Sequence, residues 1–325
     1  MESRRRLDSQ SPIAVFGFNR PNHLLRTLAA LSANVGAKNS PLFLFIDGPR
    51  NDEDKQLIHE CLEISSNFQN QFSSFDVHKQ DSNQGLARSI ISGVSKVLEN
   101  YSTVIVVEDD LVTSKLFLDF MNRGLKAYEL NPEVASIHGF VTPFKKPLSQ
   151  PFFMRGADCW GWATWRDRWK LFNPNGRELL DQLEAQGLVN GFDLGGAYPF
   201  SGMLKDQIAG KNNSWAIRWH ASIFLQNKLT LYPARTYVVN IGFDGSGTHT
   251  GHTSIYDSEL SQVQQQLPSK IEVSQAGIRE LSRWYREVYF GKTRQIKKIL
   301  IGPYLRVKNF LNRIVLKIFR MMSIK

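Results

Sequence analysis

Thr103-Val-Ile-Val-Val-Glu-Asp-Asp-Leu111 is the stretch that decides the fold and locates a candidate site. Its first five residues are all β-branched, a composition typical of a strand that is buried on both faces. The strand pattern ends in three consecutive acids, Glu108, Asp109 and Asp110. Burying a carboxylate without a partner is costly, so acids in this position indicate a bound cation or a proton-handling site. They are also compatible with a solvated turn that caps a helix over residues 115–130.

The first half of the sequence alternates between strand and helix patterns. Apolar runs at 13–18, 42–46, 75–79 and 134–139 indicate further strands, and apolar residues at helical spacing indicate helices at 21–31, 52–64 and 86–98. This alternation requires right-handed crossovers and predicts an α/β fold with a mostly parallel sheet flanked by helices. In such a sheet the carboxyl ends of the strands share one edge, where ligands bind.

Polar residues follow each of the first four predicted strands, and we expect them to line one crevice. They are Asn19 with Arg20, Asp47, Asp81 with Asn83 and Gly85, and the acidic triplet. Arg20 and Arg88 are suited to neutralising phosphate charge, and Gly85 allows backbone N–H groups to approach an anion. The sequence lacks the glycine patterns of a dinucleotide-binding Rossmann turn and of a P-loop, which argues against both of these sites.

Three segments carry a resemblance to a known family. Phe18-Asn-Arg-Pro21, Asn83-x-Gly-Leu-Ala-Arg88 and Val106-Val-Glu-Asp-Asp-Leu111 resemble the nucleotide-sugar half of GT-A-fold glycosyltransferases of the family 2-like group. The Glu-Asp-Asp form is similar to that of N-acetylglucosaminyltransferase I. The resemblance covers roughly residues 12–250. It implies a GT-A (Rossmann-like) domain at 1–287, with a nucleotide-sugar half at 12–140 and an acceptor half at 141–287.

The resemblance also implies roles for individual residues. Asp110 would hold a divalent metal, Mn²⁺ or Mg²⁺, on the nucleotide diphosphate, and Asp47 would face the nucleoside. The other contacts to the nucleotide sugar are expected from Asn19, Arg20, Asn83, Gly85, Arg88, Glu108 and Asp109.

The second half is rich in aromatic residues. Four of the seven tryptophans fall within residues 160–169. One interpretation is a sugar platform, in which Trp160, Trp162 and Trp165 pack on sugar rings while Asp158 or Arg166 binds hydroxyls. The resemblance implies that this segment lines the acceptor side. The other interpretation is a tryptophan-rich segment that packs on the sheet.

Two acids and a glycine-containing loop complete the expected site. Asp206 precedes a Trp-Ala-Ile-Arg-Trp segment, a pattern similar to the one in which the family places the base of an inverting transfer. Asp193 is a rival base, and a plain surface role for Asp206 remains open. Residues 240–249 are expected to close the crevice. Within them, His249 could ligate the metal, contact the diphosphate or cap the loop, with His252 as its nearest competitor.

The net charge of +10 is confined to the C-terminal tail, residues 288–325. Residues 1–287 carry equal numbers of acids and bases, whereas the tail has ten bases and no acid. Apolar residues recur in the tail at three- and four-residue steps, which predicts a basic amphipathic helix suited to an anionic membrane surface. Docking on the catalytic domain or on a second subunit is the rival interpretation. With two cysteines and no signal-peptide pattern, we expect a cytoplasmic protein, peripheral on the inner face of the cell membrane.

The sequence therefore predicts a metal-dependent, inverting glycosyltransferase. It would move a hexosyl or N-acetylhexosaminyl group from a nucleotide-diphosphate sugar to a saccharide or glycolipid acceptor, in surface polysaccharide or glycolipid synthesis. One alternative is a nucleotidyltransferase acting on sugar phosphates, which should carry a Gly- and Arg-rich loop near the first strand. A second is a non-catalytic protein that binds membrane or nucleic acid. The neutral charge of residues 1–287 argues against nucleic acid as a partner.

Overall fold

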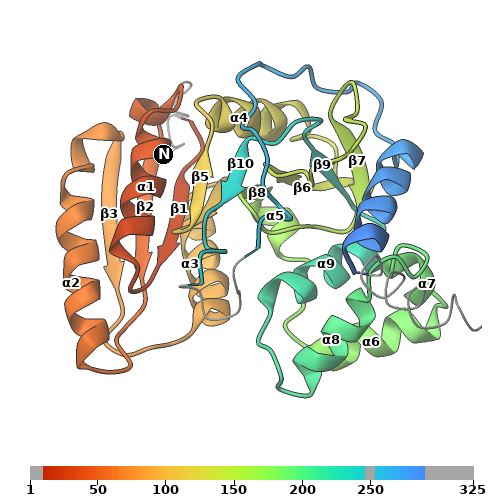
Figure 1. Cartoon of the computed structure of the whole chain (residues 1–325), viewed down its shortest axis with the longest axis horizontal. Helices are drawn as coiled ribbons and strands as arrows, with labels where there is room; N and C mark the ends of the chain where they lie inside the picture. The colour runs from red at the N-terminus through yellow and green to blue at the C-terminus, as the bar shows by residue number, and fades with distance from the viewer. Residues whose placement is uncertain (1–9, 246–252, 290–325) are drawn as a thin grey trace, which may run out of the picture.

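The computed structural model describes residues 10–245 and 253–289, and its centre is an eight-stranded sheet of order β3-β2-β1-β4-β8-β6-β9-β7 (Figure 1). Its strands are β1 (Ile13–Gly17), β2 (Pro41–Ile46), β3 (Ser74–Lys79), β4 (Thr103–Glu108), β6 (Val134–His138), β7 (Phe152–Arg155), β8 (Trp162–Trp165) and β9 (Leu229–Tyr232). Two short strands, β5 (Leu111–Thr113) and β10 (Val238–Asn240), form a separate antiparallel pair.

The sheet is mostly parallel. The four strands β1 to β4 all run parallel to one another, and β6 is parallel to β9. Strand β8 is antiparallel to both β4 and β6, so β4 and β6 run in the same direction. Only β8 and the edge strand β7 run the other way in this sheet. The prediction of an α/β fold with a mostly parallel sheet flanked by helices is confirmed.

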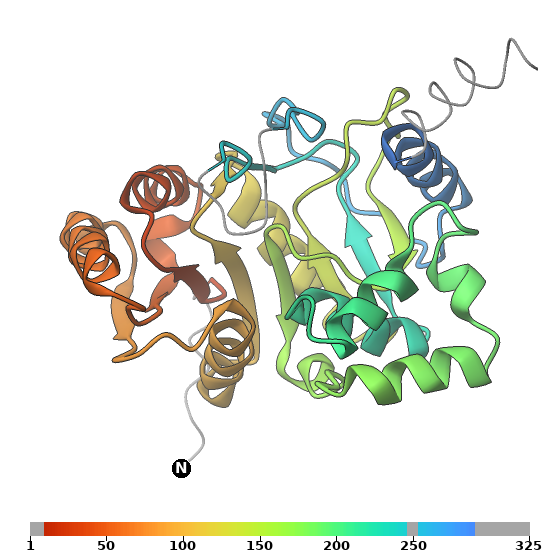
Figure 2. The ribbon, with the colours of Figure 1, turned by 60° about the horizontal axis from the view of Figure 1, so that its bottom comes forward.

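Helices cover both faces of the sheet (Figure 2). The helices are α1 (Pro21–Ser32), α2 (Asp52–Ser66), α3 (Leu86–Asn100), α4 (Phe117–Ala127), α5 (Arg166–Trp169), α6 (Gly176–Ala185), α7 (Val189–Phe192), α8 (Phe200–Ile208), α9 (Trp215–Leu225) and a last helix at 275–289. Alternate residues of β1 face the two layers. Ile13 and Val15 pack with α1, α2 and α4, whereas Ala14 and Phe16 pack with α3, α5 and α9.

The elements predicted for the first half are confirmed, with ends that agree within three residues. The capping interpretation of the acidic triplet is wrong, because β5 separates the acids from α4, whose N-cap residue is Leu116. Residues of the triplet therefore lie at the carboxyl end of β4 and not at the start of a helix.

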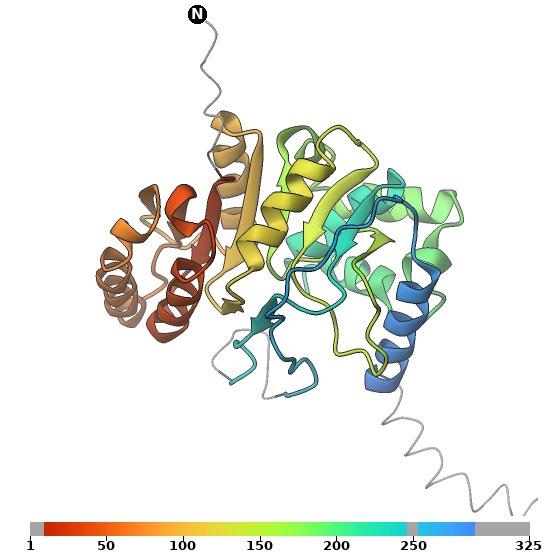
Figure 3. The ribbon, with the colours of Figure 1, turned by 90° about the horizontal axis from the view of Figure 1, so that it is seen from above.

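The second half joins the same sheet through β8, which lies between β4 and β6. Helices α6 to α9 add a small core of their own beside it. Residues 253–274 cross this half before the last helix (Figure 3). Gln265 fastens them: its backbone carbonyl accepts from Arg123 of α4, and its side chain bonds the backbone of Ala234 and Arg235. Within the described residues, no helix is long and apolar enough to span a membrane. His249, His252 and residues 290–325 of the predicted tail lie outside the described residues.

Candidate active site

The acidic triplet lies beside the residues that follow β1. Arg20, directly before α1, forms ion pairs with both Asp109 and Asp110. Its guanidinium nitrogen lies 3.0 Å from the Oδ2 of Asp110. The backbone N–H of Asp109 donates to the carbonyl of Phe16, and the backbone carbonyl of Asp109 accepts from the hydroxyl of Thr27. These contacts fix the end of β4 against the end of β1 and the start of α1.

The triplet concentrates negative charge in a protected place. Burial raises the pKa of Glu108, and the charges of Asp110 and Asp109 raise it further. Burial also raises the pKa of Asp109, although the Arg20 guanidinium opposes this. One guanidinium does not balance three carboxylates, so the arrangement favours an additional cation.

Asp110 is the acid of the triplet that best fits a metal ligand. Its side chain is 14% exposed, against 4% for Asp109. The backbone N–H of Ile241 donates to its carbonyl at 2.8 Å, and a Cβ at Gly242 would lie 2.3 Å from its Oδ2. A side chain at position 242 would displace this carboxylate, because the chain after β10 passes close over it. Closure of the crevice by residues 240–249 stays a prediction, since residues 246–249 lie outside the described ranges.

Asp110 would need ligands from elsewhere to hold a metal. In the described ranges, 10–245 and 253–289, no three His, Cys, Asp or Glu side chains are grouped to hold a metal ion. Mg²⁺ commonly binds through one or two carboxylates together with substrate phosphate oxygens and water. One accessible carboxylate at the end of β4 fits that mode, in which a diphosphate completes the coordination.

Asp47 organises the loop before α3. Its Oδ1 accepts from the N–H groups of Gly48 and Gln84, both at 2.8 Å. Its Oδ2 accepts from the N–H of Gly85 at 2.8 Å and from the side chain of Asn83 at 3.0 Å. The backbone N–H of Gly85 was expected to approach an anion, and in the structure this anion is the carboxylate of Asp47. Contact between Asp47 and a nucleoside stays a prediction.

The loop nevertheless leaves space at the start of α3. Gly85 has φ +78°, a conformation that favours glycine, and nothing lies within 4 Å of where its Cβ would be. Arg88 is exposed one turn further on, and Asn19 donates to Asp54 at the start of α2 at 2.6 Å. The predicted donor residues after β1, β2 and β3 thus lie on loops at the same edge of the sheet as the triplet, except Arg88, which lies in the first turn of α3.

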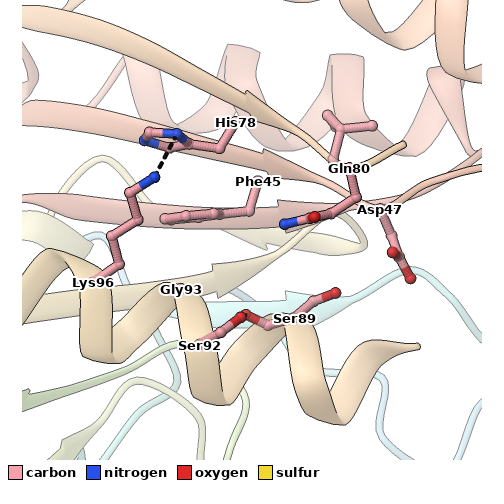
Figure 4. A pocket seen from close by; sticks show the side chains of 9 residues that line it. Phe45, Asp47, His78, Gln80, Ser89, Ser92, Gly93 and Lys96 are labelled. Atoms are coloured by element: carbon pink, nitrogen blue, oxygen red, sulfur yellow. Dashed lines mark hydrogen bonds between the residues drawn. The ribbon is translucent and has the colours of Figure 1, made fainter. Parts of the chain in front are cut away.

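A small pocket of about 130 Å³ lies between β2, β3 and α3 (Figure 4). Asp47 stands at one end, and Lys96 reaches toward His78 at the other, with 3.2 Å between Nζ and Nδ1. The ring of Phe45 stacks on His78 with 4.9 Å between centroids. This volume is below the range of roughly 300–1,000 Å³ that encloses a drug-sized ligand, so a whole nucleotide sugar would extend beyond it.

Two of the tryptophans predicted as sugar platforms do not fit that role. Trp162 is 0% exposed and Trp165 is 2% exposed, because both belong to β8 inside the sheet. A ring without an exposed face cannot pack on a ligand, so this prediction is wrong for both residues. Trp162 instead stacks on Trp215 with 5.3 Å between centroids. Trp160 precedes the strand, is only partly buried and remains compatible with an acceptor contact.

Asp158 and Cys159 connect the acceptor half to the triplet. The side chain of Asp158 is 40% exposed, and its Oδ1 accepts from the Cys159 N–H at 2.8 Å. Burial raises the pKa of the Cys159 thiol, and the charges of Asp158, Glu108 and Asp110 raise it further. Since β8 pairs antiparallel with β4, with Trp162 opposite Val106, the residues that precede β8 lie at the end of β4 that carries the triplet.

The two acids predicted as bases lie on other elements. Asp206 is on α8, half exposed, with an ion pair to Lys211 at 3.0 Å. Asp193 accepts from both the N–H and the hydroxyl of Ser201, at 2.7 and 2.6 Å, and so fixes the start of α8. Neither has a described contact with the triplet. The role of Asp206 stays a prediction.

Sequence reasoning missed two features of this site. Arg20 was expected on phosphate, but here it binds the triplet, because β1 and β4 are neighbours in the sheet. Trp160 also contacts Phe243 and Tyr256, with centroids 5.5 and 4.9 Å away. The aromatic residues after β10 gave a signal in the sequence, but their partner could not be read from it.

Comparisons with known proteins give only distant likenesses. No family model and no curated protein matches the sequence. Residues 1–349 of TarS from S. aureus are 11% identical over 48% of this chain and 47% of that one, with a TM-score of 0.33. The mannosyltransferase PcManGT from Pyrobaculum calidifontis, in complex with GDP-Man and Mn²⁺, is 11% identical over 54% and 47%, with a TM-score of 0.34.

A third solved structure is glucosyl-3-phosphoglycerate synthase from Mycobacterium tuberculosis with Mn²⁺, UDP and glucosyl-3-phosphoglycerate. It is 12% identical over 55% of this chain and 67% of that one, with a TM-score of 0.32. This chain spans about half the length of the first two structures. At these scores the likeness gives no information on the roles of individual residues.

Proposed function

We propose that this chain is a metal-dependent GT-A glycosyltransferase that moves a sugar from a nucleotide-diphosphate sugar to an acceptor hydroxyl. The observation that carries the proposal is the position of the Glu-Asp-Asp triplet. It lies at the carboxyl end of β4, next to the loops after β1 and β10, and within electrostatic reach of Cys159 in the acceptor half. Ligands of open α/β sheets bind at this edge.

The residues of the crevice divide the work of such a transfer. Asp110 would hold the cation, Mn²⁺ or Mg²⁺, against the diphosphate, and Arg20 keeps the Asp110 carboxylate in place through its ion pair. When bound, the cation stabilises the charge of the departing nucleotide diphosphate. Arg88, exposed at the start of α3, is placed to meet phosphate oxygens. An acid on the acceptor side takes the hydroxyl proton.

The acceptor and the cellular role extend this proposal. A saccharide or glycolipid acceptor suits the partly exposed aromatic residues around Trp160. The basic tail at 288–325 would hold the enzyme on an anionic membrane surface, where surface polysaccharides or glycolipids are built. The transferred hexosyl or N-acetylhexosaminyl group would invert its configuration if attack comes from the face opposite the diphosphate.

The test is a panel of UDP-, GDP- and ADP-linked sugars, each with Mn²⁺, with Mg²⁺ or with excess chelator. A true donor should raise the melting temperature in the presence of metal, because binding at about 100 times Kd stabilises by about 2.7 kcal/mol. It should also release nucleotide diphosphate slowly through hydrolysis.

The matched variant is Asp110→Asn, which keeps the side-chain size but removes the charge. We expect metal-stimulated turnover to fall by about 10²–10³-fold, the usual size for removing one transition-state contact. Full turnover in excess chelator, or in Asp110→Asn, would remove the metal from the mechanism. Pyrophosphate formed from a nucleoside triphosphate and a sugar phosphate would identify a nucleotidyltransferase instead.

A further inference from the structure

Asp158 differs from the other candidate bases in what surrounds it. It has no lysine or arginine as an ion-pair partner in the described ranges, whereas Asp206 pairs with Lys211. The nearest group that could carry a positive charge is His138, with 3.9 Å between its Nε2 and the Asp158 Oδ1. Burial lowers the pKa of His138, which disfavours the charged form of its ring. The Nε2 of His138 already accepts from the Trp160 N–H at 3.1 Å. The Asp158 carboxylate is thus accessible and not neutralised.

Aromatic side chains from four segments form a continuous array beside Asp158. Trp160 contacts Tyr256, with 4.9 Å between centroids, and Tyr256 contacts Trp284 of the last helix at 5.3 Å. Trp284 contacts Tyr285 at 5.2 Å, and Tyr285 contacts Tyr198 at 4.5 Å. The array therefore joins the segment before β8, the segment of Tyr256 that follows β10, the last helix and the segment before α8.

Asp158 and Trp160 of the array both lie against His138, whose Nε2 is 3.9 Å from the Asp158 carboxylate and 3.1 Å from the Trp160 backbone nitrogen. Burial raises the pKa of Tyr198, Tyr256 and Tyr285, and the charge of Asp158 contributes to the rise in each of them. The same charge acts on the Cys159 thiol, which also interacts with Glu108 and Asp110 of the triplet. Strand β8 pairs antiparallel with β4, with Trp162 opposite Val106, so Asp158, which precedes β8, lies at the end of β4 that carries the triplet.

Building on the proposed glycosyl transfer, we propose that Asp158 is the general base for the acceptor hydroxyl, and that the acceptor is an uncharged saccharide held against this tyrosine array. Flat aromatic faces pack on the C–H faces of sugar rings, and the phenol groups bond sugar hydroxyls. An acceptor with a phosphate at this position would meet the repulsion of the Asp158 carboxylate.

The step balances without any further reactant. The acceptor O–H bond breaks as its proton moves to a carboxylate oxygen of Asp158. The acceptor oxygen forms a bond to the anomeric carbon of the donor sugar, and the bond from that carbon to the diphosphate breaks. The bonding electrons leave with the nucleotide diphosphate.

The experiment uses the full chain, Mn²⁺ and the nucleotide sugar with the largest turnover in the panel above. Water serves as one acceptor, and a panel of methyl glycosides serves as the saccharide acceptors. Asp158→Asn should lower kcat by about 10²–10⁴-fold for both, while the donor Kd and the melting temperature stay unchanged. Asp181→Asn, on the exposed face of α6, is the matched control and should keep full turnover.

Tyr256→Ala tests the acceptor surface separately. It should raise the KM for methyl glycosides at least tenfold, a change of about 1.4 kcal/mol, and lower kcat by a much smaller factor. Normal turnover in Asp158→Asn would overturn the assignment, as would a loss of turnover that comes with loss of donor binding. Loss confined to Asp206→Asn would return the role to that residue. If no nucleotide sugar binds the natural chain, the proposed function fails and this inference with it.

Discussion

The two halves of this sheet are stabilised by different chemistry. At the edge formed by β1 to β4, polar side chains bond backbone groups and one another, as Asp47 does with four donors and Arg20 with two acids. Beyond β8, stacked rings dominate, and Trp162 contacts Trp169, Trp215 and Trp219 at 5.3–6.1 Å. The first half thus holds charged groups in fixed positions, and the second is built by the packing of rings.

The largest effect should come from breaking the packed rings. Trp162→Ala removes a fully buried ring from the middle of four tryptophans, and we expect the free energy of unfolding to fall by about 3–5 kcal/mol. Urea denaturation followed by circular dichroism measures this loss.

Trp160→Ala is its control, since that ring is only partly buried. It should lose less than half as much stability and should instead weaken the binding of methyl glycosides. Equal losses of stability in the two variants would mean that both rings are structural, and that the aromatic region has no surface reserved for a ligand.

A middle-sized effect should come from the polar edge. Asp47→Ala leaves the N–H groups of Gly48, Gln84 and Gly85 without their acceptor, and water can satisfy them only in part. We expect a loss of about 2–3 kcal/mol in stability. Donor affinity should fall with it, because the loop before α3 loses its fixed shape. Asp81→Asn, exposed in the same connection, should change stability by less than about 0.5 kcal/mol.

The same contrast explains how much the sequence could predict. Strands β1 to β4 and helices α1 to α3 follow from local periodicity, and the polar residues after each strand converge because parallel strands end at one edge. The donor side of the candidate site therefore needed only local patterns. The triplet and Arg88 could be proposed from them without knowledge of the strand order, whereas the choice of Asp110 as the metal ligand came from the resemblance and stays a prediction.

The acceptor side depends on pairings that no local pattern contains. Strand β8 is four residues long and lies between β4 and β6, so burial of Trp162 and Trp165 follows from its place in the sheet. The sequence shows the cluster of tryptophans, but it does not show which of their rings stays exposed in the fold. The aromatic array beside Asp158 likewise requires Trp160, Tyr198, Tyr256 and the last helix to meet, although they are far apart in the sequence.

The smallest effect should come from a polar contact at the outer side of the same edge. Asp54 accepts from Arg50 at 2.8 Å and from Asn19 at 2.6 Å, and these bonds lower the pKa of its carboxyl to about 2. A depressed carboxyl pKa stabilises the fold above the unfolded value of about 4, and this stability is lost as the pH falls toward 2. Arg50 is half exposed, so we expect only about 1–2 kcal/mol.

Asp54→Asn should show this component directly. At pH 7 the variant should be less stable than the natural chain, and the difference should shrink between about pH 4 and pH 2 as the natural carboxylate takes up its proton. Urea midpoints over this range measure it, with Asp52→Asn, exposed on the same helix, as the control. A difference that stays constant with pH would mean that Asp54 acts through the shape of its hydrogen bonds. The charge of Asp54 would then contribute nothing to stability, and charged groups at this edge would stabilise the fold only through the triplet. The two halves would otherwise differ only in how their side chains pack.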